Sequence, residues 1–437
     1  MDIYIVQPGD NIDAIATKYN MTTERLITDN GLISPYALTP GQALLILYPK
    51  ETYTVHPGDT LESIASSTGT SILQLYRNNP LLYERSNIIP GESLVLSYNT
   101  ERDIYTNGYV YYYINPDILK MTLPYLTHLS IFNYRILKNG DIITYGDDQY
   151  IIDLAKEFHT LPLLMTSALS PTGELELENV YELLLDQESQ NRLIENMLLL
   201  LQERGFYGVN ILLSYVTIIN QRLYLELIEK ISKILKSNHY IVIITMNPKV
   251  EYQDDTVTYK KIDYNSFSQH VDKIIFLQEL WGTNTNPPGP ISSYYLVNSF
   301  INSITKEISQ NTVSIGIPLI AYNWTLPYVP GTTMALSLSL DSALIIAYEQ
   351  RSVIQFDELS QSPYFLYVSS LVGYPVTHIV WFIDVRSIMA LNDIISEYNL
   401  NGSGIWNIMS YNQVLWSTIN ARFNIIKIES DNNTLNI

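Results

Sequence analysis

The sequence predicts an α/β protein in which two small βααβ modules precede a (β/α)8 barrel that carries a small α+β insertion. Three observations favour this fold class: a pattern repeated within the first hundred or so residues, a later alternation of β-rich apolar runs with helical stretches, and one gap too long for an ordinary loop. The chain has 437 residues, enough for two or three domains, and its hydrophobic content of 46% is ample for a well-buried core.

The repeat begins at residues 4–12, whose pattern recurs at residues 53–61. Asn30 is echoed by Asn79, and Pro40-Gly41 is echoed by Pro90-Gly91. Each copy reads as a strand, a Pro-Gly turn, two short helices and a closing strand. The predicted helices span 12–19, 23–29, 61–67 and 71–78, and the closing strands span 43–48 and 93–98. Asp10 and Asp59 follow the turns, where a carboxylate is expected to cap the first helix.

The barrel is predicted from eight apolar runs of strand length. They span 109–114, 129–134, 161–167, 209–213, 241–246, 273–278, 313–319 and 404–408. Helical patterns lie between them, at 150–158, 189–204, 221–238 and 296–310 among others. Strands that alternate with helices in this way favour a parallel, helix-covered TIM barrel.

The gap from residue 324 to residue 403 exceeds an ordinary connection between a strand and a helix. It holds short strand patterns at 352–356, 365–368 and 378–382, which predict an inserted α+β unit. The predicted domains are module 1 at 1–49, module 2 at 50–98, a polar linker at 99–107, and the barrel at 108–430 with its insertion at about 325–400.

Charge and composition exclude several classes of function. The formal net charge of -19 disfavours binding to nucleic acids and to anionic membrane surfaces, whereas neutral glycans remain open as partners. No apolar run reaches the length of a membrane span, and the N-terminus lacks a secretory signal pattern, so we expect synthesis in the cytoplasm without Sec export. Cysteine is absent and the six histidines show no ligand spacing, so neither a metal nor a cofactor is expected.

The candidate functional strand lies within residues 205–215, directly after an Arg-Gly turn. Alternate residues of a strand share a face, so Asn210, Leu212 and Ser214 project together. Enzymes with a barrel fold keep their reactive groups at this end of the strands. Here the face holds no charge.

Both modules resemble LysM domains. The shared features are an aromatic-x-Val strand, Pro-Gly-Asp-[Asn/Thr]-[Ile/Leu], an Asn near the end of the second helix, and Pro-Gly-x-x-Leu before the last strand. The resemblance implies recognition of N-acetylglucosamine-containing glycans, peptidoglycan or chitin, largely through backbone groups of two loops. The alternative is a module kept only for packing or localisation. The implied residues are Gly9, Asp10, Asn11, Asn30, Gly31 and Leu32 in module 1, and Gly58, Asp59, Thr60, Asn79, Pro80 and Leu81 in module 2.

The strand at 205–215 resembles the signature of family 18 glycoside hydrolases, Asp-Gly-x-x-x-Asp-x-Glu, in the spore-associated branch that couples such a barrel to LysM modules. Further matching stretches lie at 123–132, 191–196, 287–291, 316–324, 380–387 and 404–406, so the resemblance covers the whole chain. In the family, the sugar's own acetamido group attacks and the last Glu is the general acid. That Glu corresponds to Ser214, its neighbouring Asp to Leu212, and the first Asp to Tyr207.

Later motifs of the family are altered too. Its Met-x-Tyr-[Asp/Glu]-Trp corresponds to residues 277–281, with Glu279 in place of Tyr and Leu280 in place of the acid. Its Tyr-Gly-Tyr-Asp-Trp corresponds to residues 320–324, with Asn323 in place of Asp. In Phe-Glu-Asp, only Asp384 keeps its charge. We therefore expect hydrolysis by the ordinary mechanism to be absent, and Glu279 is the one candidate for a relocated acid.

The aromatic positions of the family are kept in part. Tyr215, Tyr322 and Trp406 are expected to contact sugar, whereas Trp281 and Trp324 either stack on sugar or fill the barrel mouth. The leading hypothesis is a glycan-binding, non-catalytic protein of the spore cortex or coat, which other coat or cortex proteins could join. Two alternatives stay open: an active N-acetylglucosaminidase or cortex-lytic hydrolase that uses Glu279, and a structural coat scaffold.

Overall fold

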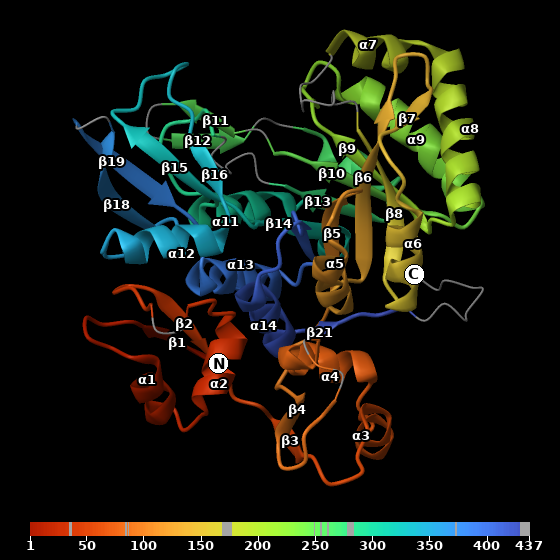
Figure 1. Cartoon of the computed structure of the whole chain (residues 1–437). Coiled ribbons are helices and arrows are strands. Elements are labelled where there is room, and N and C mark those ends of the chain that lie inside the picture. Colours follow the sequence, from red (N-terminus) through yellow and green to blue (C-terminus); the bar gives the residue numbers. More distant parts are fainter. Residues whose placement is uncertain are drawn as a thin grey trace.

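The computed structural model describes residues 1–34, 37–83, 85, 87–167, 177–248, 250–253, 256–259, 262–277, 284–371 and 374–428. Figure 1 shows the two small modules side by side beneath the barrel, with the inserted unit beside the barrel and above module 1. No helix within the described ranges is long and apolar enough to cross a membrane.

Both modules have the predicted βααβ order. Module 1 contains β1 (Asp2–Ile5), α1 (Ile12–Lys18), α2 (Thr23–Asn30) and β2 (Ala43–Ile46), and β1 pairs antiparallel with β2. Module 2 contains β3 (Glu51–Thr54), α3 (Leu61–Thr68), α4 (Ile72–Asn78), the short 3-10 helix η1 (Pro80–Tyr83) and β4 (Ser93–Ser97). Each module buries its own small apolar core, around Ile12 and Leu26 in the first and Ile64 and Leu75 in the second.

The predicted capping role of Asp10 and Asp59 is wrong. The side chains of Asn11 and Thr60 cap the helices by accepting from the amides of Ala14 and Ser63. Each Asp instead accepts from a turn amide and from a tyrosine hydroxyl. For Asp10 these donors are Gln7 N at 2.7 Å and Tyr4 OH at 2.7 Å, and for Asp59 they are His56 N at 2.8 Å and Tyr53 OH at 2.9 Å. The backbone bond, more than the tyrosine, lowers the pKa of both carboxyls. The carboxylate therefore ties the turn to the first strand.

Eight parallel strands close into the predicted barrel, since the last strand pairs with the first. They are β5 (Asp103–Tyr111), β6 (His128–Ile136), β8 (Leu161–Ser167), β9 (Gly208–Leu213), β10 (Ile241–Met246), β13 (Lys273–Phe276), β14 (Val313–Pro318) and β20 (Gly402–Trp406). The outer helices include α5 (Pro116–Thr122), α6 (Gln149–Glu157), α8 (Gln187–Arg204), α9 (Gln221–Ser237) and α11 (Tyr294–Ile304).

Two predicted boundaries were wrong. The first barrel strand begins at Asp103, inside the segment predicted as a linker, because Ile104 is fully buried and the Thr106 hydroxyl donates to Tyr125 O at 2.6 Å. The helix predicted to reach residue 310 ends at Ile304, followed by a single 3-10 turn, η3 (Gln310–Thr312), before β14. Polar residues in both segments serve buried hydrogen bonds or turns, which composition alone does not distinguish.

The inserted unit is a five-stranded antiparallel sheet in the order β16-β15-β19-β18-β17. Its strands are β16 (Leu336–Leu338), β15 (Ala321–Leu326), β19 (Tyr374–Trp381), β18 (Ser362–Leu371) and β17 (Gln355–Asp357), with α12 (Leu340–Glu349) between β16 and β17. After the sheet, α13 (Val385–Glu397) returns to the barrel and packs near β14, although it falls within the segment predicted as insertion.

Both modules dock on the last barrel helix, α14 (Gln413–Arg422). A Cβ added at Gly31 of module 1 would lie 2.7 Å from Gln413 Cβ, so the backbone there touches the start of α14. In module 2, Asn420 Nδ2 donates to Asn78 Oδ1 at 2.8 Å, and Arg77 Nη1 donates to Pro124 O at 3.1 Å. Nearly every residue of α14 is consequently buried. The modules are held on the barrel by specific contacts.

The Pro-Gly turns before the closing strands provide a matched test of this docking. Gly41 and Gly91 both have positive φ, 84° and 94°, but a Cβ at Gly41 would lie 1.9 Å from Ile354 O whereas Gly91 has open space. We expect Gly91→Ala to cost about 1–2 kcal/mol from backbone strain alone. Gly41→Ala should cost about a further 1–3 kcal/mol, because the turn must move away from Ile354 of the inserted unit. Thermal unfolding of both variants measures the difference; equal losses would show that the contact at Gly41 contributes nothing.

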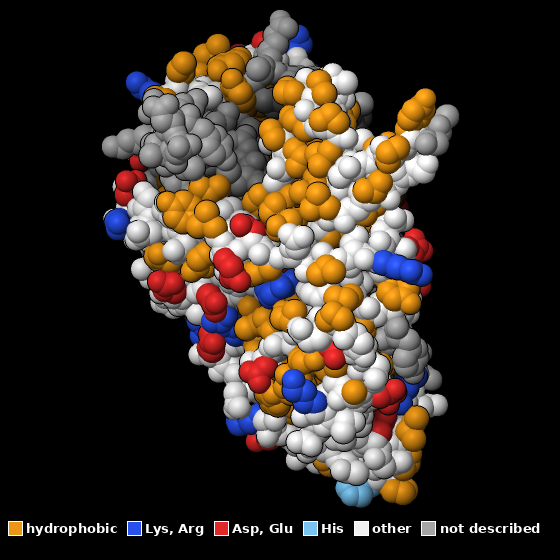
Figure 2. All heavy atoms as spheres, turned by 90° about the vertical axis from the view of Figure 1, so that its left-hand side faces the viewer, with side chains coloured by type: hydrophobic (Ala, Val, Ile, Leu, Met, Phe, Trp, Pro, Cys, Tyr) orange, Lys and Arg blue, Asp and Glu red, His pale blue; other side chains and the backbone are white. Residues whose placement is uncertain are grey.

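The surface beside the inserted sheet is partly apolar. Leu366, Val368 and Tyr374 are exposed on β18 and β19. Figure 2 shows hydrophobic side chains gathered over the upper half of this face, whereas acidic and basic side chains are interspersed lower down. Such exposed apolar side chains are common on soluble domains, and by themselves they do not identify a partner.

Candidate functional site

The strand β9 is placed by two glycines. Gly205 ends α8 in the left-handed conformation, with φ 74°, and turns the chain into the strand. At Gly208 a Cβ would lie 2.1 Å from Ile241 O of β10, so only glycine allows the strands to approach this closely. The strand then carries Asn210 and Leu212 into the barrel interior, as the alternation predicted.

Asn210 belongs to a chain of hydrogen-bonded neutral side chains that crosses the barrel. Its Nδ2 donates to Ser130 Oγ at 2.8 Å, and the Ser130 hydroxyl donates to Asn107 Oδ1 at 2.8 Å. On the other side, Thr245 Oγ1 donates to Asn210 Oδ1 at 2.7 Å and lies 2.7 Å from the Tyr109 hydroxyl. Burial raises the pKa of Tyr109. The chain of five side chains contains no carboxylate, so it cannot supply a general acid near neutral pH.

Leu212 and Ser214 occupy the end of this strand. Leu212 is half-buried and packs on the apolar side chains inside the barrel. The Ser214 hydroxyl oxygen is buried and has no hydrogen-bond partner among the described residues. A serine without an adjacent base is a weak nucleophile, and its hydroxyl is a poor acid. Neither position offers acid catalysis.

The following loop is held rigidly by Asn220. This buried side chain accepts from Thr217 N at 2.7 Å and donates to Tyr215 O at 2.9 Å and Tyr181 OH at 3.2 Å. The Tyr215 ring is half-buried. The loop therefore fixes the backbone of Tyr215 beside the end of β9.

The aromatic side chains of β15 differ in exposure. Trp324 is fully buried, and its indole Nε1 donates to Asn286 O at 2.9 Å, so it fills space within the protein. Tyr322 is half-buried and meets Trp324 edge-on, with 5.6 Å between ring centroids. Asn323 Nδ2 donates to Tyr367 OH at 2.8 Å, while its Oδ1 is buried with no partner among the described residues.

Trp406 lies at the end of β20 and is half-buried, with its ring centroid 5.1 Å from that of Tyr109. The peptide bond that follows it is cis. Of the predicted aromatic positions, Trp406 thus packs on the apolar side chains inside the barrel. Glu279, Leu280 and Trp281 lie outside the described residues.

Asp384, the acid kept in its motif, is engaged outside the barrel. Its carboxylate pairs with Arg386, whose Nη2 lies 2.6 Å from Oδ2, and it accepts from Arg386 N at 2.8 Å at the start of α13. The same guanidinium donates to Gly41 O at 3.3 Å and stacks over the Phe356 ring. Asp384 therefore organises the docking of module 1.

The predicted glycan residues of the modules fall into two groups. The side chains of Asn30 and Asn79 are buried and bind within their own modules: Asn30 bonds to Leu45 N and O, and Asn79 bonds to Val95 N and O. Only their backbones are left to contact a glycan, and the glycan role itself stays a prediction. Four of the others remain at the surface, in turns that the hydrogen bonds of Asp10 and Asp59 support: Gly9, Asn11, Gly58 and Thr60. The last four line a pocket: Gly31, Leu32, Pro80 and Leu81.

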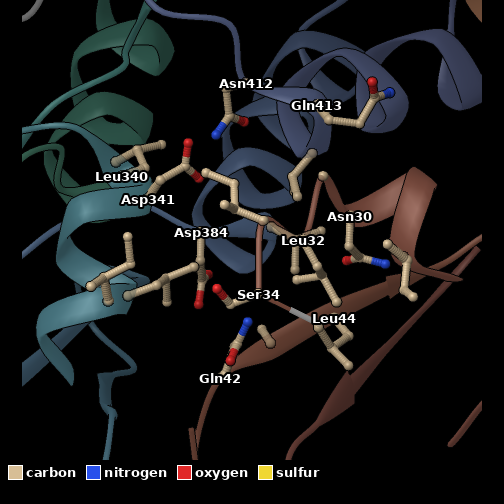
Figure 3. A pocket seen from close by; sticks show the side chains of 18 of the residues that line it. Asn30, Leu32, Ser34, Gln42, Leu44, Leu340, Asp341, Asp384, Asn412 and Gln413 are labelled. Carbon is tan, nitrogen blue, oxygen red and sulfur yellow. The ribbon is translucent and has the colours of Figure 1, made fainter. Parts of the chain in front are cut away.

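This pocket, of about 690 Å³, lies between module 1 and the barrel (Figure 3). Module 1 contributes the end of α2, the loop after it and the start of β2, and module 2 contributes η1. The other wall comes from one face along the length of α12 and from the first turns of α13 and α14. The sequence had not singled out Gln42, Asp341, Asn412 or Gln413, which also line it. No local motif could reveal them, because they come from separate units. No group of three or more His, Asp or Glu side chains suited to a metal ion occurs in the described part of the chain.

Comparison with known proteins places these features in context. The sequence model described as glycosyl hydrolases family 18 matches residues 97–410, and the model of the LysM domain matches residues 4–46 and 53–97. The chain is 29% identical over 414 residues to YdhD of Bacillus subtilis, which carries the name of a sporulation-specific glycosylase; the match covers 93% of this chain and 95% of YdhD.

A second relative is the cortical fragment-lytic enzyme of Bacillus subtilis, 28% identical over 434 residues, with 98% of this chain and 99% of the relative covered. Among solved structures, the spore cortex-lytic enzyme SleL of Bacillus megaterium matches with a TM-score of 0.79 and 25% identity, over 98% of this chain and 99% of that one. These matches span both modules and the barrel.

Proposed function

The chain belongs to glycosyl hydrolase family 18 and carries two LysM domains, and from this premise we propose that it binds N-acetylglucosamine-containing glycan of the spore wall without hydrolysing it. The carrying observation is the uncharged strand end at Leu212 and Ser214, above a barrel interior whose polar side chains form a neutral chain. Loss of the general acid alone removes about 10²–10⁴ in rate.

Several features support a binding role. The two LysM domains are folded around intact cores, and their first turns are held by Asp10 and Asp59. Trp406 at the end of the barrel strand β20 and Tyr322 on β15 of the inserted sheet are only half-buried, and rings of this kind stack on sugar faces without acid groups. The relatives that cover nearly the whole chain are named for sporulation or for the spore cortex, which supports placement in the cortex or coat.

The test combines retention with turnover. We expect the purified chain to be retained on spore-cortex peptidoglycan or on chitin and to release no new reducing ends over hours. Glu279→Gln should change neither result. Turnover that Glu279→Gln abolishes would instead establish the enzyme with a relocated acid. Absence of retention on both polymers would contradict glycan binding and favour a structural scaffold.

A further inference from the structure

The pocket between module 1 and the barrel offers more than the loops of an isolated module. Building on the glycan binding proposed above, we propose that it is a composite site for one uncharged, N-acetylated sugar unit, recognised jointly by module 1 and by α12, α13 and α14. Its volume of about 690 Å³ lies within the range typical of small-molecule sites, which are mostly apolar with a few convergent polar groups.

Gln42 supplies a polar group that lacks a partner. Its side chain is only 5% exposed, and its Oε1 accepts from Thr39 N at 3.1 Å, which fixes the orientation of the amide. The amide nitrogen then points into the pocket, as Figure 3 shows, and it donates to no group among the described residues. Because this nitrogen faces the pocket and has no acceptor within the described protein, it is available to a ligand that offers an oxygen.

The position in module 2 that is equivalent to Gln42 does not line this pocket. Glu92 corresponds to Gln42, and its Oε1 accepts from Ile89 N at 2.8 Å just as Gln42 accepts from Thr39. Its second oxygen, however, pairs with Arg85 inside module 2. The repeat therefore uses one side chain to brace the turn in both copies, but only in module 1 is the other end of that side chain left for a ligand.

The opposite wall supplies an acceptor. Asp341 lies in the first turn of α12, is half-buried, and has no hydrogen bond or ion pair among the described residues. Burial raises the pKa of this carboxyl. Asn412 lines the pocket nearby at the start of α14, where its Oδ1 accepts from Leu415 N, whereas the Gln413 amide is engaged by Tyr411 and Ser417.

The charges of the wall exclude an anionic ligand. Asp341 and Glu349 line the pocket together with Asp384, which is paired with Arg386, and the described lining includes no lysine or arginine. A cation would satisfy Asp341 but would leave the Gln42 donor without an acceptor. Hydroxyl and acetamido groups offer donors and acceptors without net charge, and the apolar side chains of Leu32, Leu344 and Ile383 suit an acetamido methyl group or a sugar face. An N-acetylated sugar offers an acceptor to Gln42 and a donor to Asp341, and it carries no net charge.

The experiment titrates the full chain with the tetramer of N-acetylglucosamine by calorimetry. Gln42→Glu keeps the oxygen that accepts from Thr39 and removes the donor, so we expect affinity at this site to fall about tenfold. Leu344→Trp fills the cavity and should remove this site, seen as a lower stoichiometry. The reciprocal variant Glu92→Gln is the control and should bind like the wild type. Thermal unfolding checks that each variant is folded.

The outcomes separate this inference from the proposed function. If the wild type binds and Gln42→Glu and Leu344→Trp bind equally well, the composite site is wrong while glycan binding stands. If the wild type does not bind the tetramer but is retained on cortex peptidoglycan or chitin, the composite site is likewise wrong while glycan binding stands; if it binds none of the three, glycan binding itself is wrong. A lysine-containing peptide serves as the second probe: binding that tightens in Gln42→Glu would show that the pocket takes a cation, and would overturn the sugar.

Discussion

Acidification from pH 6.5 towards pH 3 is expected to lower the free energy of unfolding by about 5 kcal/mol through His128 alone. His128 begins β6, is 1% exposed, and stacks on Tyr105 with 5.9 Å between ring centroids. Burial, together with the smaller effect of the nearby Lys273 and Lys427, lowers the pKa of His128 to about 3. The folded state therefore keeps the imidazole neutral where the unfolded chain binds a proton.

The direction in which stability changes with pH follows from the number of protons that each state binds. Between pH 6.5 and 3 the unfolded chain carries the extra proton, so stability falls as pH falls and is fully restored above pH 6.5. His128→Phe retains a ring against Tyr105 but does not titrate, and it should flatten the dependence of the melting temperature on pH in this window. His56→Gln, at an exposed histidine, should leave that dependence unchanged. An unchanged slope in His128→Phe would contradict the assignment.

Lys427→Met is expected to destabilise the protein by about 2–4 kcal/mol. The Lys427 ammonium lies within hydrogen-bond distance of four oxygens, to which its three N–H groups donate: Leu123 O at 2.7 Å, Leu126 O at 2.5 Å, Phe158 O at 3.0 Å and Thr160 Oγ1 at 2.8 Å. Burial lowers the pKa of Lys427 well below its usual range. Methionine fills similar space but leaves these buried oxygens without enough hydrogen-bond donors. Removing the ammonium also removes the cost of burying its charge, but that gain offsets only part of the loss.

The control for this variant is Lys120→Met on α5, where the lysine is exposed; its effect should stay within about 0.5 kcal/mol. Chemical unfolding of the two variants, followed by far-UV circular dichroism, measures the difference. Equal stability of the two would show that the ammonium is not needed to hold the tail against α5 and α6. The tail itself also pairs with β5, since Ile426 N donates to Ile104 O at 3.0 Å.

Local patterns carried much of the architecture. The recurrence of Pro-Gly-Asp marked two modules, and apolar runs of strand length marked all eight barrel strands, because burial on both sides of a parallel strand leaves a continuous apolar signal. The absence of charge at Leu212 and Ser214 was likewise readable, since it depends only on residue type at a given spacing. These features need only neighbours in sequence.

Other features depended on partners far away in the chain. Sequence suggested Asp10 as a helix cap, but the competing donors Gln7 N and Tyr4 OH were closer in the fold. Trp324 could have faced sugar or the interior, and the loop at Asn286 decided the matter by covering it. Asn30 could have faced a glycan, and its amide is instead consumed by Leu45 of the closing strand.

By itself, the sequence determined that two modules precede a barrel and that the candidate functional strand at 205–215 is uncharged inside the barrel, because periodicity and residue type are local properties. Only the tertiary structure decided that module 1 is docked through Gly41 and Arg386, and that a pocket forms between units far apart in the chain. The physical reason is that a composite pocket exists only when separate surfaces are brought into contact, and no spacing within one segment records which surfaces those are.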